Sequence, residues 1–167
     1  METQKVKTEN KIIKDVARLE NDVYRITAWK GRDGKAFLEL RVCFKQNGKL
    51  HKTREGIHIP ANLRFEIAKA LIAVKNAPEL PLPQEGKKCE TALLTAIQIS
   101  ESEEYQFSKV RGVKNQYVRI CRAFKGRQGT FVPNAKKALS ILDSSVDDLA
   151  EALVSLEAAP VKEAVAA

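Results

Sequence analysis

The sequence predicts an α+β protein of two tandem ββββα repeats, in which one helix covers each antiparallel four-stranded sheet. Three observations support this fold class. Similar residues recur in the same order 80 to 82 positions apart. Apolar and polar residues alternate with a period of two in several segments, as in half-buried strands. Apolar residues also recur at helical spacing near the end of each repeat.

The two repeats match at a displacement that changes only at turns. Tyr24 matches Tyr105 at a displacement of 81, and Phe44 matches Phe124 at 80. After the next turn the displacement is 82, so that Ile57 falls on Leu139. Glycine, asparagine and aspartate are frequent where the displacement changes, and surface loops tolerate such insertions.

Domain boundaries follow from these matches and from the prolines. We predict the first repeat at residues 10–77 and the second at residues 91–158. Residues 78–90 form a linker that begins with three prolines in six residues, a composition that makes a chain stiff and extended. Residues 159–167 are predicted to be a flexible tail.

Alternation and turn residues place four strands in the first repeat. A glycine-containing turn and an Asn-Gly hairpin signal separate them. The expected strands are residues 24–29, 35–45, 49–52 and 56–59. Apolar residues at helical spacing then predict an amphipathic helix over residues 61–76.

The second repeat has the same order of elements. Strands begin near Tyr105 and Val118, and a helix begins at 143–145, where Ser145 and Asp148 fit a loose capping box. The segments that precede the two units stay open. The apolar spacing in residues 10–20 favours a helix, whereas the end of residues 91–99 could form a strand.

Charge is distributed unevenly along a chain of 167 residues with a formal net charge of +8. Residues 24–54 contain nine basic residues and two acidic ones, and residues 105–142 contain nine basic residues and no acid. Residues 139–167, by contrast, contain six acidic residues and a single lysine. Two such basic segments are typical of a polyanion-binding surface, although a solvated charged surface is the simpler alternative.

The location of the protein is predicted from absent signals and from the cysteines. The sequence has no apolar run long enough to span a membrane and no apolar signal segment near Met1. Cys43, Cys89 and Cys121 are an odd number at wide spacing, as expected for reduced thiols. We therefore expect a cytoplasmic protein of a prokaryote or of a phage-infected host, or a nuclear protein in a eukaryote, with no membrane partner.

The sheet face opposite the helix would present aromatic and basic side chains together. In the first repeat this face has Arg25, Trp29, Lys35, Phe37 and Arg41, and the second repeat adds Tyr117, Arg119 and Lys125. Exposed rings beside cations suit single-stranded nucleic acid, because phosphates pair with the cations and bases stack on the rings. The alternative is that Trp29 and Phe37 form a second core or an interface.

Parity alone does not decide whether the ends of the long strands lie in the core or at the surface. Phe44 and Phe124 fall on the helix-covered face, which favours a place in the core. Arg122 falls on that same face, and an uncompensated buried guanidinium is costly. If this strand end leaves the core, Phe124 stacks on bases and Arg122 contacts a phosphate; both alternatives remain open.

Catalysis is not expected. His51 and His58 have no cysteine at metal-ligand spacing, and no Gly-rich phosphate loop occurs. Asp33 and Glu39 are lone acids in the basic segments, and Glu39 is better placed as an internal salt-bridge partner. We therefore expect no enzyme activity, no metal and no cofactor.

Residues 29–31, residues 37–44, Gly48 and residues 54–59 of the first repeat form an ordered run of motifs. This run resembles the transcriptional coactivator family called positive cofactor four. Glu55 stands where that family has lysine, and in the second repeat Val110 and Cys121 replace an aromatic residue and the strand arginine. The resemblance covers about 50 residues of the first repeat and is weaker in the second.

This resemblance implies a curved four-stranded sheet with a helix, and single-stranded DNA held in basic channels without catalysis. It also implies a homodimer or, in a tandem chain, an intramolecular pseudo-dimer like that of the related purine-rich-element-binding proteins. Carried over by position, the channel residues of the first repeat are Trp29, Lys30, Lys35, Arg41, Phe44 and Arg54. Those of the second repeat are Arg111, Lys114, Tyr117, Arg122, Phe124, Lys136 and Lys137. The basic segments add Arg32 and Lys109 as nucleic-acid-binding candidates.

The sequence thus predicts a single-stranded-DNA-binding protein with weak sequence preference, acting in replication, recombination or transcription. Melted duplex is a further expected ligand. One alternative is a regulator that binds single-stranded RNA. Another is an adaptor that uses the sheet to bind an acidic protein.

Overall fold

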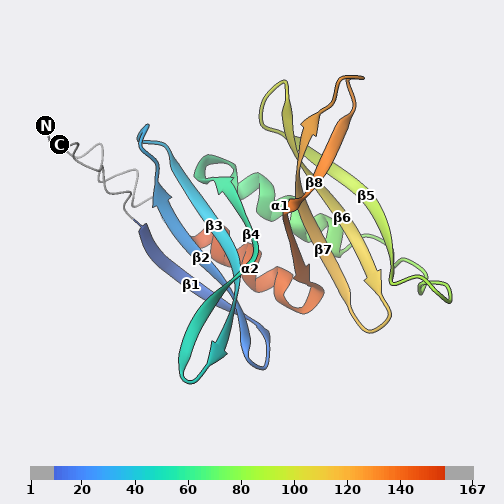
Figure 1. The fold of residues 1–167 in the computed structure, drawn as a ribbon, viewed down its shortest axis with the longest axis horizontal. Helices are drawn as coiled ribbons and strands as arrows, with labels where there is room; N and C mark the ends of the chain where they lie inside the picture. The colour runs from blue at the N-terminus through green and yellow to red at the C-terminus, as the bar shows by residue number, and fades with distance from the viewer. Residues whose placement is uncertain (1–9, 157–167) are drawn as a thin grey trace, which may run out of the picture.

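The computed structural model describes residues 10–156, which form two antiparallel four-stranded sheets with two helices between them (Figure 1). The strands lie in chain order within each sheet, β1-β2-β3-β4 and β5-β6-β7-β8. This confirms the predicted α+β fold of tandem ββββα units. The predicted tail at 159–167 lies outside the described residues.

The strands of the first sheet are β1 (Asn10–Leu19), β2 (Asp22–Lys30), β3 (Ala36–Gln46) and β4 (Lys49–Pro60). Those of the second are β5 (Cys89–Gln98), β6 (Glu103–Gly112), β7 (Gln116–Lys125) and β8 (Phe131–Leu142).

The strands of the first unit differ in two respects from those predicted. Residues 49–60 form one continuous strand, β4, where two short strands were expected, and a register shift between Arg41 and Cys43 interrupts its pairing with β3. The remaining strand of this sheet is β1, which decides the segment left open by the sequence: its apolar spacing favoured a helix, but residues 10–19 form a strand. Val16 pairs with Tyr24 of β2 and is buried in the apolar core, and these tertiary contacts override the helical spacing.

Both helices lie between the sheets and pack on each other. The 3-10 helix η1 (Ala61–Leu63) joins β4 to α1 (Arg64–Lys75), and α2 (Asp143–Ser155) follows β8 directly. Helix α1 contacts β5, β6 and β7 of the second sheet, and α2 contacts β1 of the first sheet as well as β7 and β8. The helix of the first repeat therefore packs against the sheet of the second, which joins the repeats into a single pseudo-dimer.

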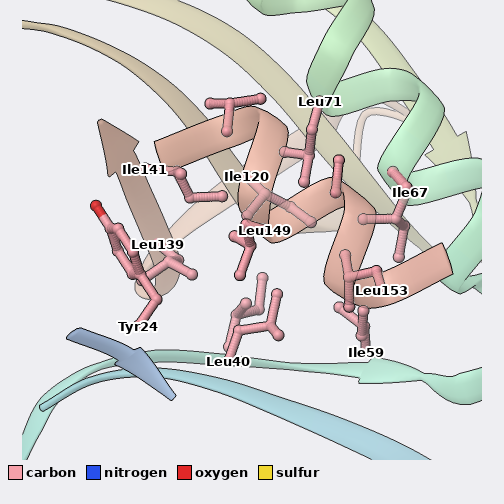
Figure 2. Packing of buried hydrophobic residues seen from close by; sticks show 14 of the residues in the cluster. Tyr24, Leu40, Ile59, Ile67, Leu71, Ile120, Leu139, Ile141, Leu149 and Leu153 are labelled. Atoms are coloured by element: carbon pink, nitrogen blue, oxygen red, sulfur yellow. The ribbon is translucent and has the colours of Figure 1, made fainter. Parts of the chain in front are cut away.

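One continuous apolar core contains both repeats (Figure 2). Leu40 and Ile59 of the first sheet, Leu71 of α1, and Ile120 and Leu149 of the second repeat all belong to it. Each of these side chains is fully buried. No helix among residues 10–156 is long and apolar enough to cross a membrane.

Two equivalent tyrosines make reciprocal hydrogen bonds between the repeats. The hydroxyl of Tyr24 donates to the Ser140 carbonyl oxygen at 2.9 Å, and the hydroxyl of Tyr105 donates to the His58 carbonyl oxygen at 2.7 Å. Ser140 and His58 are themselves equivalent at the displacement of 82. Such exchanged contacts are typical of a two-fold interface, here made within one chain.

Candidate nucleic-acid interface

The uncovered face of the first sheet holds a row of aromatic side chains. Trp29 of β2 pairs in register with Phe37 of β3, and their rings are parallel within 3° with centroids 6.2 Å apart. The ring of His58, from β4, meets Phe37 edge-on at 5.3 Å. Trp29 and Phe37 are partly exposed, and alternation within the strands points both away from the buried Ala28 and Leu38. The sheet therefore presents two stacked rings on a face that the helix pair does not cover.

A buried carboxylate holds cations beside these rings. Glu39, whose side chain is 8% exposed, lies 3.3 Å from the Arg41 guanidinium, 3.5 Å from the Lys52 amine and 3.0 Å from His58 Nε2. Burial alone would raise the pKa of Glu39, but the hydrogen bond from His58 and the charges of Arg41 and Lys52 together lower it. The Lys52 amine also lies 5.8 Å from the centre of the Trp29 ring, within cation–π range.

Arg41 is fixed by its surroundings on β4. Its guanidinium donates to the Thr53 carbonyl oxygen at 2.8 Å. A Cβ at Gly56 would lie 2.8 Å from the guanidinium carbon and 3.0 Å from the Leu40 carbonyl oxygen. Gly56 therefore leaves the space that Arg41 occupies. Glu39 thus forms the internal salt bridges predicted for it, with Arg41 and Lys52.

The remaining candidates of the first repeat lie around this face. Arg25 is bound to Asp15 through two hydrogen bonds of 2.8 and 3.0 Å, so that its charge is partly neutralised. Lys30, Arg32 and Lys35 lie in or beside the turn between β2 and β3. Arg54 is exposed on β4, and Phe44 packs on His51 with ring centroids 5.3 Å apart.

The matching face of the second sheet has different chemistry. Val110 stands at the position of Trp29 and Cys121 at that of Arg41, while Tyr117 keeps the position of Phe37. Arg119 replaces Glu39, and no ion pair involves Arg119 within residues 10–156. This face therefore offers one ring and one guanidinium, without the stacked pair and the cation cluster of the first sheet.

Aromatic and basic residues meet again at the far end of β7 and β8. The Arg122 guanidinium lies 5.7 Å from the centre of the Phe124 ring, and the Lys137 amine lies 5.1 Å from it. Arg122 is also bound to Glu103 of β6. Phe124 and Arg122 are half-buried and Lys137 is exposed. The end of β7 thus leaves the core, which is the second of the two alternatives stated for Phe124 and Arg122. Glu103 compensates the charge of the Arg122 guanidinium.

One predicted interface residue, Lys109, lies at the junction of the repeats instead. Lys109 is only 2% exposed, and its amine donates to the carbonyl oxygens of Lys75 and Ala77 at the C-terminal end of α1. Arg111 is half-buried, and its Nε atom has no partner within the described residues. Burial raises the pKa of nearby Asp143, and the positive charges of Lys109, Lys75 and Arg111 oppose this rise. As placed, the amine of Lys109 caps a helix and cannot contact a phosphate, which corrects the prediction.

Lys52 and His58 belong to the first-sheet face but were not predicted there. Both lie on β4, whose register shift moves residues before Gly56 relative to those after it. Alternation along β4 therefore could not assign Lys52 to a face. The predicted candidates Lys114 and Lys136 are exposed, on the turn after β6 and on β8.

No family profile matches the chain, and no curated protein matches it significantly. Within residues 10–156, no group of three or more His, Cys, Asp or Glu side chains is placed to hold a metal ion.

Proposed function

We propose that this protein binds single-stranded DNA with weak sequence preference, in replication, recombination or transcription. The observation that supports this most is the stacked pair of Trp29 and Phe37, partly exposed on an uncovered sheet face with the Lys52 amine against the Trp29 ring. Every base has a π face that can stack on an aromatic ring, so such a surface binds strands of many different sequences. A duplex offers no free base faces, so only melted duplex would bind in this way.

Each group on the first-sheet face has a separate role in this proposal. The rings of Trp29 and Phe37 receive unstacked bases. Arg41 and Lys52 pair with phosphates, while Glu39 holds them in place and prevents their mutual repulsion. An arginine held in this way loses less side-chain entropy when a phosphate binds.

The end of the β7–β8 hairpin provides a second contact for the same strand or for another one. Phe124 offers a ring within cation–π range of Arg122 and Lys137, and the exposed Lys136 adds a further charge on β8. Because the first-sheet face and this hairpin differ in chemistry, we propose that the first sheet contributes most of the base stacking.

Titration of a single-stranded oligonucleotide tests the proposal directly. Trp29 is the only tryptophan of the chain, so stacking of a base on it should quench the intrinsic fluorescence. Trp29→Ala and Phe37→Ala should each weaken binding about five- to a hundredfold, from a stacking energy of roughly 1–3 kcal/mol per base. Phe65→Ala is the matched control, because this exposed ring lies on helix α1 and so belongs to neither uncovered sheet face.

Salt dependence tests the electrostatic part of the proposal. If about five phosphates are neutralised, the slope of log K against log salt should be about −3 to −4. Affinity that does not change with salt, or no binding of any oligonucleotide at low salt, would refute the proposal and favour the protein adaptor. A collapse of thermal stability in Trp29→Ala would mean that the rings are structural. Competition between matched DNA, RNA and duplex oligonucleotides decides the preferred ligand.

A further inference from the structure

The outer edge of β5 is an exposed strand edge with almost no charge. Its ten residues contain one charged side chain, Glu90, which pairs with Lys87 of the preceding linker. Leu93 is 57% exposed and Leu94 is 45% exposed. Within residues 10–156, no group outside β6 forms a hydrogen bond with the backbone of β5. Such an edge has free N–H and C=O groups that can pair with another strand.

The equivalent edge of the first repeat is protected. Strand β1 has four charged side chains in its ten residues, among them Lys11 and Lys14 on either side of the apolar pair that matches Leu93 and Leu94. Lysines on an edge strand oppose pairing with a second chain. Helix α2 also covers part of this edge, because the Ser145 hydroxyl donates to the Ala17 carbonyl oxygen at 2.7 Å. At the position equivalent to Ser145 the first repeat has Leu63, which has no polar group to donate.

We propose that two copies of this chain associate by antiparallel pairing of their β5 edges, which joins their second sheets into one continuous sheet. A second copy fits this edge better than a different protein, because an antiparallel edge is complementary to itself under a two-fold rotation. Each copy has a net charge of +8, so two copies repel each other wherever basic surfaces meet. The nearly uncharged β5 edge keeps that repulsion low, whereas paired β1 edges would bring lysines together.

The size of the edge predicts a weak dimer. Ten residues extend about 34 Å at roughly 3.4 Å per residue. A strip of this length that is about 10 Å wide has a smaller area than the roughly 800 Å² that each partner buries in a standard interface. The backbone hydrogen bonds and the contact of Leu93 and Leu94 between copies contribute the affinity. We therefore expect dissociation in the micromolar range.

Sedimentation velocity of the full chain, freed of nucleic acid, tests this proposal. Over about a hundredfold range of concentration around the micromolar level, the mass should rise from 18.6 kDa toward twice that value. Leu93→Lys should raise the dissociation constant of the dimer at least about tenfold, because it places a charge on the paired edge. Ile12→Lys is the matched control: Ile12 is the equivalent residue on β1, is 55% exposed, and should leave the dimer unchanged.

Each other outcome overturns the proposal. A monomer at all concentrations would exclude self-pairing, and a dimer that survives Leu93→Lys would place the interface elsewhere. Loss of the dimer in Ile12→Lys alone would assign it to β1. Circular dichroism melting checks that both variants are folded. Because mass is measured without nucleic acid, the result is independent of whether the protein binds DNA.

Discussion

The reciprocal tyrosines predict an unequal loss of stability when each hydroxyl is removed. The Tyr105 hydroxyl makes one hydrogen bond, to the His58 carbonyl oxygen. The Tyr24 hydroxyl donates to Ser140 and also accepts from the buried Leu142 amide at 3.0 Å. Burial raises the pKa of Tyr105 to about 12 and also raises that of Tyr24, so both phenols remain protonated donors at neutral pH.

The magnitude follows from counting these bonds. Tyr105→Phe removes one neutral hydrogen bond, which contributes about 1 kcal/mol to the free energy of unfolding. Tyr24→Phe removes two such bonds and the contact with Arg18 Nε at 3.2 Å, and it leaves the Leu142 amide unpaired in the interior. An unpaired buried group adds about 1–3 kcal/mol, so Tyr24→Phe should cost roughly 2–4 kcal/mol.

Urea unfolding followed by circular dichroism measures both losses. Tyr24→Phe should shift the midpoint at least about twice as far as Tyr105→Phe, with unchanged dependence on urea. In thermal melts, each kcal/mol corresponds to about 2–4 °C for a chain of this size. Equal losses, or a larger loss in Tyr105→Phe, would refute the conclusion that the Tyr24 hydroxyl contributes more to the free energy of unfolding than the Tyr105 hydroxyl. The phenylalanine variants keep the ring, so packing is matched between them.

Two further predictions concern buried charges. The pKa of Glu39 is lower in the folded protein than its ordinary value of 4.5, so the unfolded chain takes up the proton first as pH falls. Stability contributed by Glu39 is therefore present above that value and lost below it, and Glu39→Gln should flatten acid unfolding curves in this range; an unchanged curve would contradict the assignment. Lys109→Met should lower the free energy of unfolding by about 1.5–3 kcal/mol, because charged hydrogen bonds to the end of α1 are lost. DNA affinity of the folded Lys109→Met variant should equal that of the wild type, and a specific loss of affinity would restore Lys109 to the interface.

Periodicity in the sequence was sufficient for the fold class and for several side-chain faces. Alternation alone places Tyr24 and Leu40 on one face of the sheet and Trp29 and Phe37 on the other, because successive residues of a strand point to opposite faces. The repeat was likewise visible from matched residues. These features are local, and local backbone geometry determines them.

Contacts between distant segments could not be derived in this way. Alternation in β4 is interrupted by a register shift opposite Arg41, so only pairing with β3 brings Lys52 to the side of Glu39. Residues 10–20 have apolar spacing compatible with a helix, and only β2 makes them a strand. Parity also gives no information on what lies above a face.

The amino-acid sequence is enough to show that the chain is a basic tandem repeat of alternating strands and amphipathic helices. Which cations remain on the surface depends on the packing of the two repeats. Lys109 occurs in a basic segment like its neighbours, yet α1 packs against the second sheet and brings its free carbonyl groups to that amine. Charge along a chain is additive, but the exposure of each charge depends on which element from the other repeat covers it.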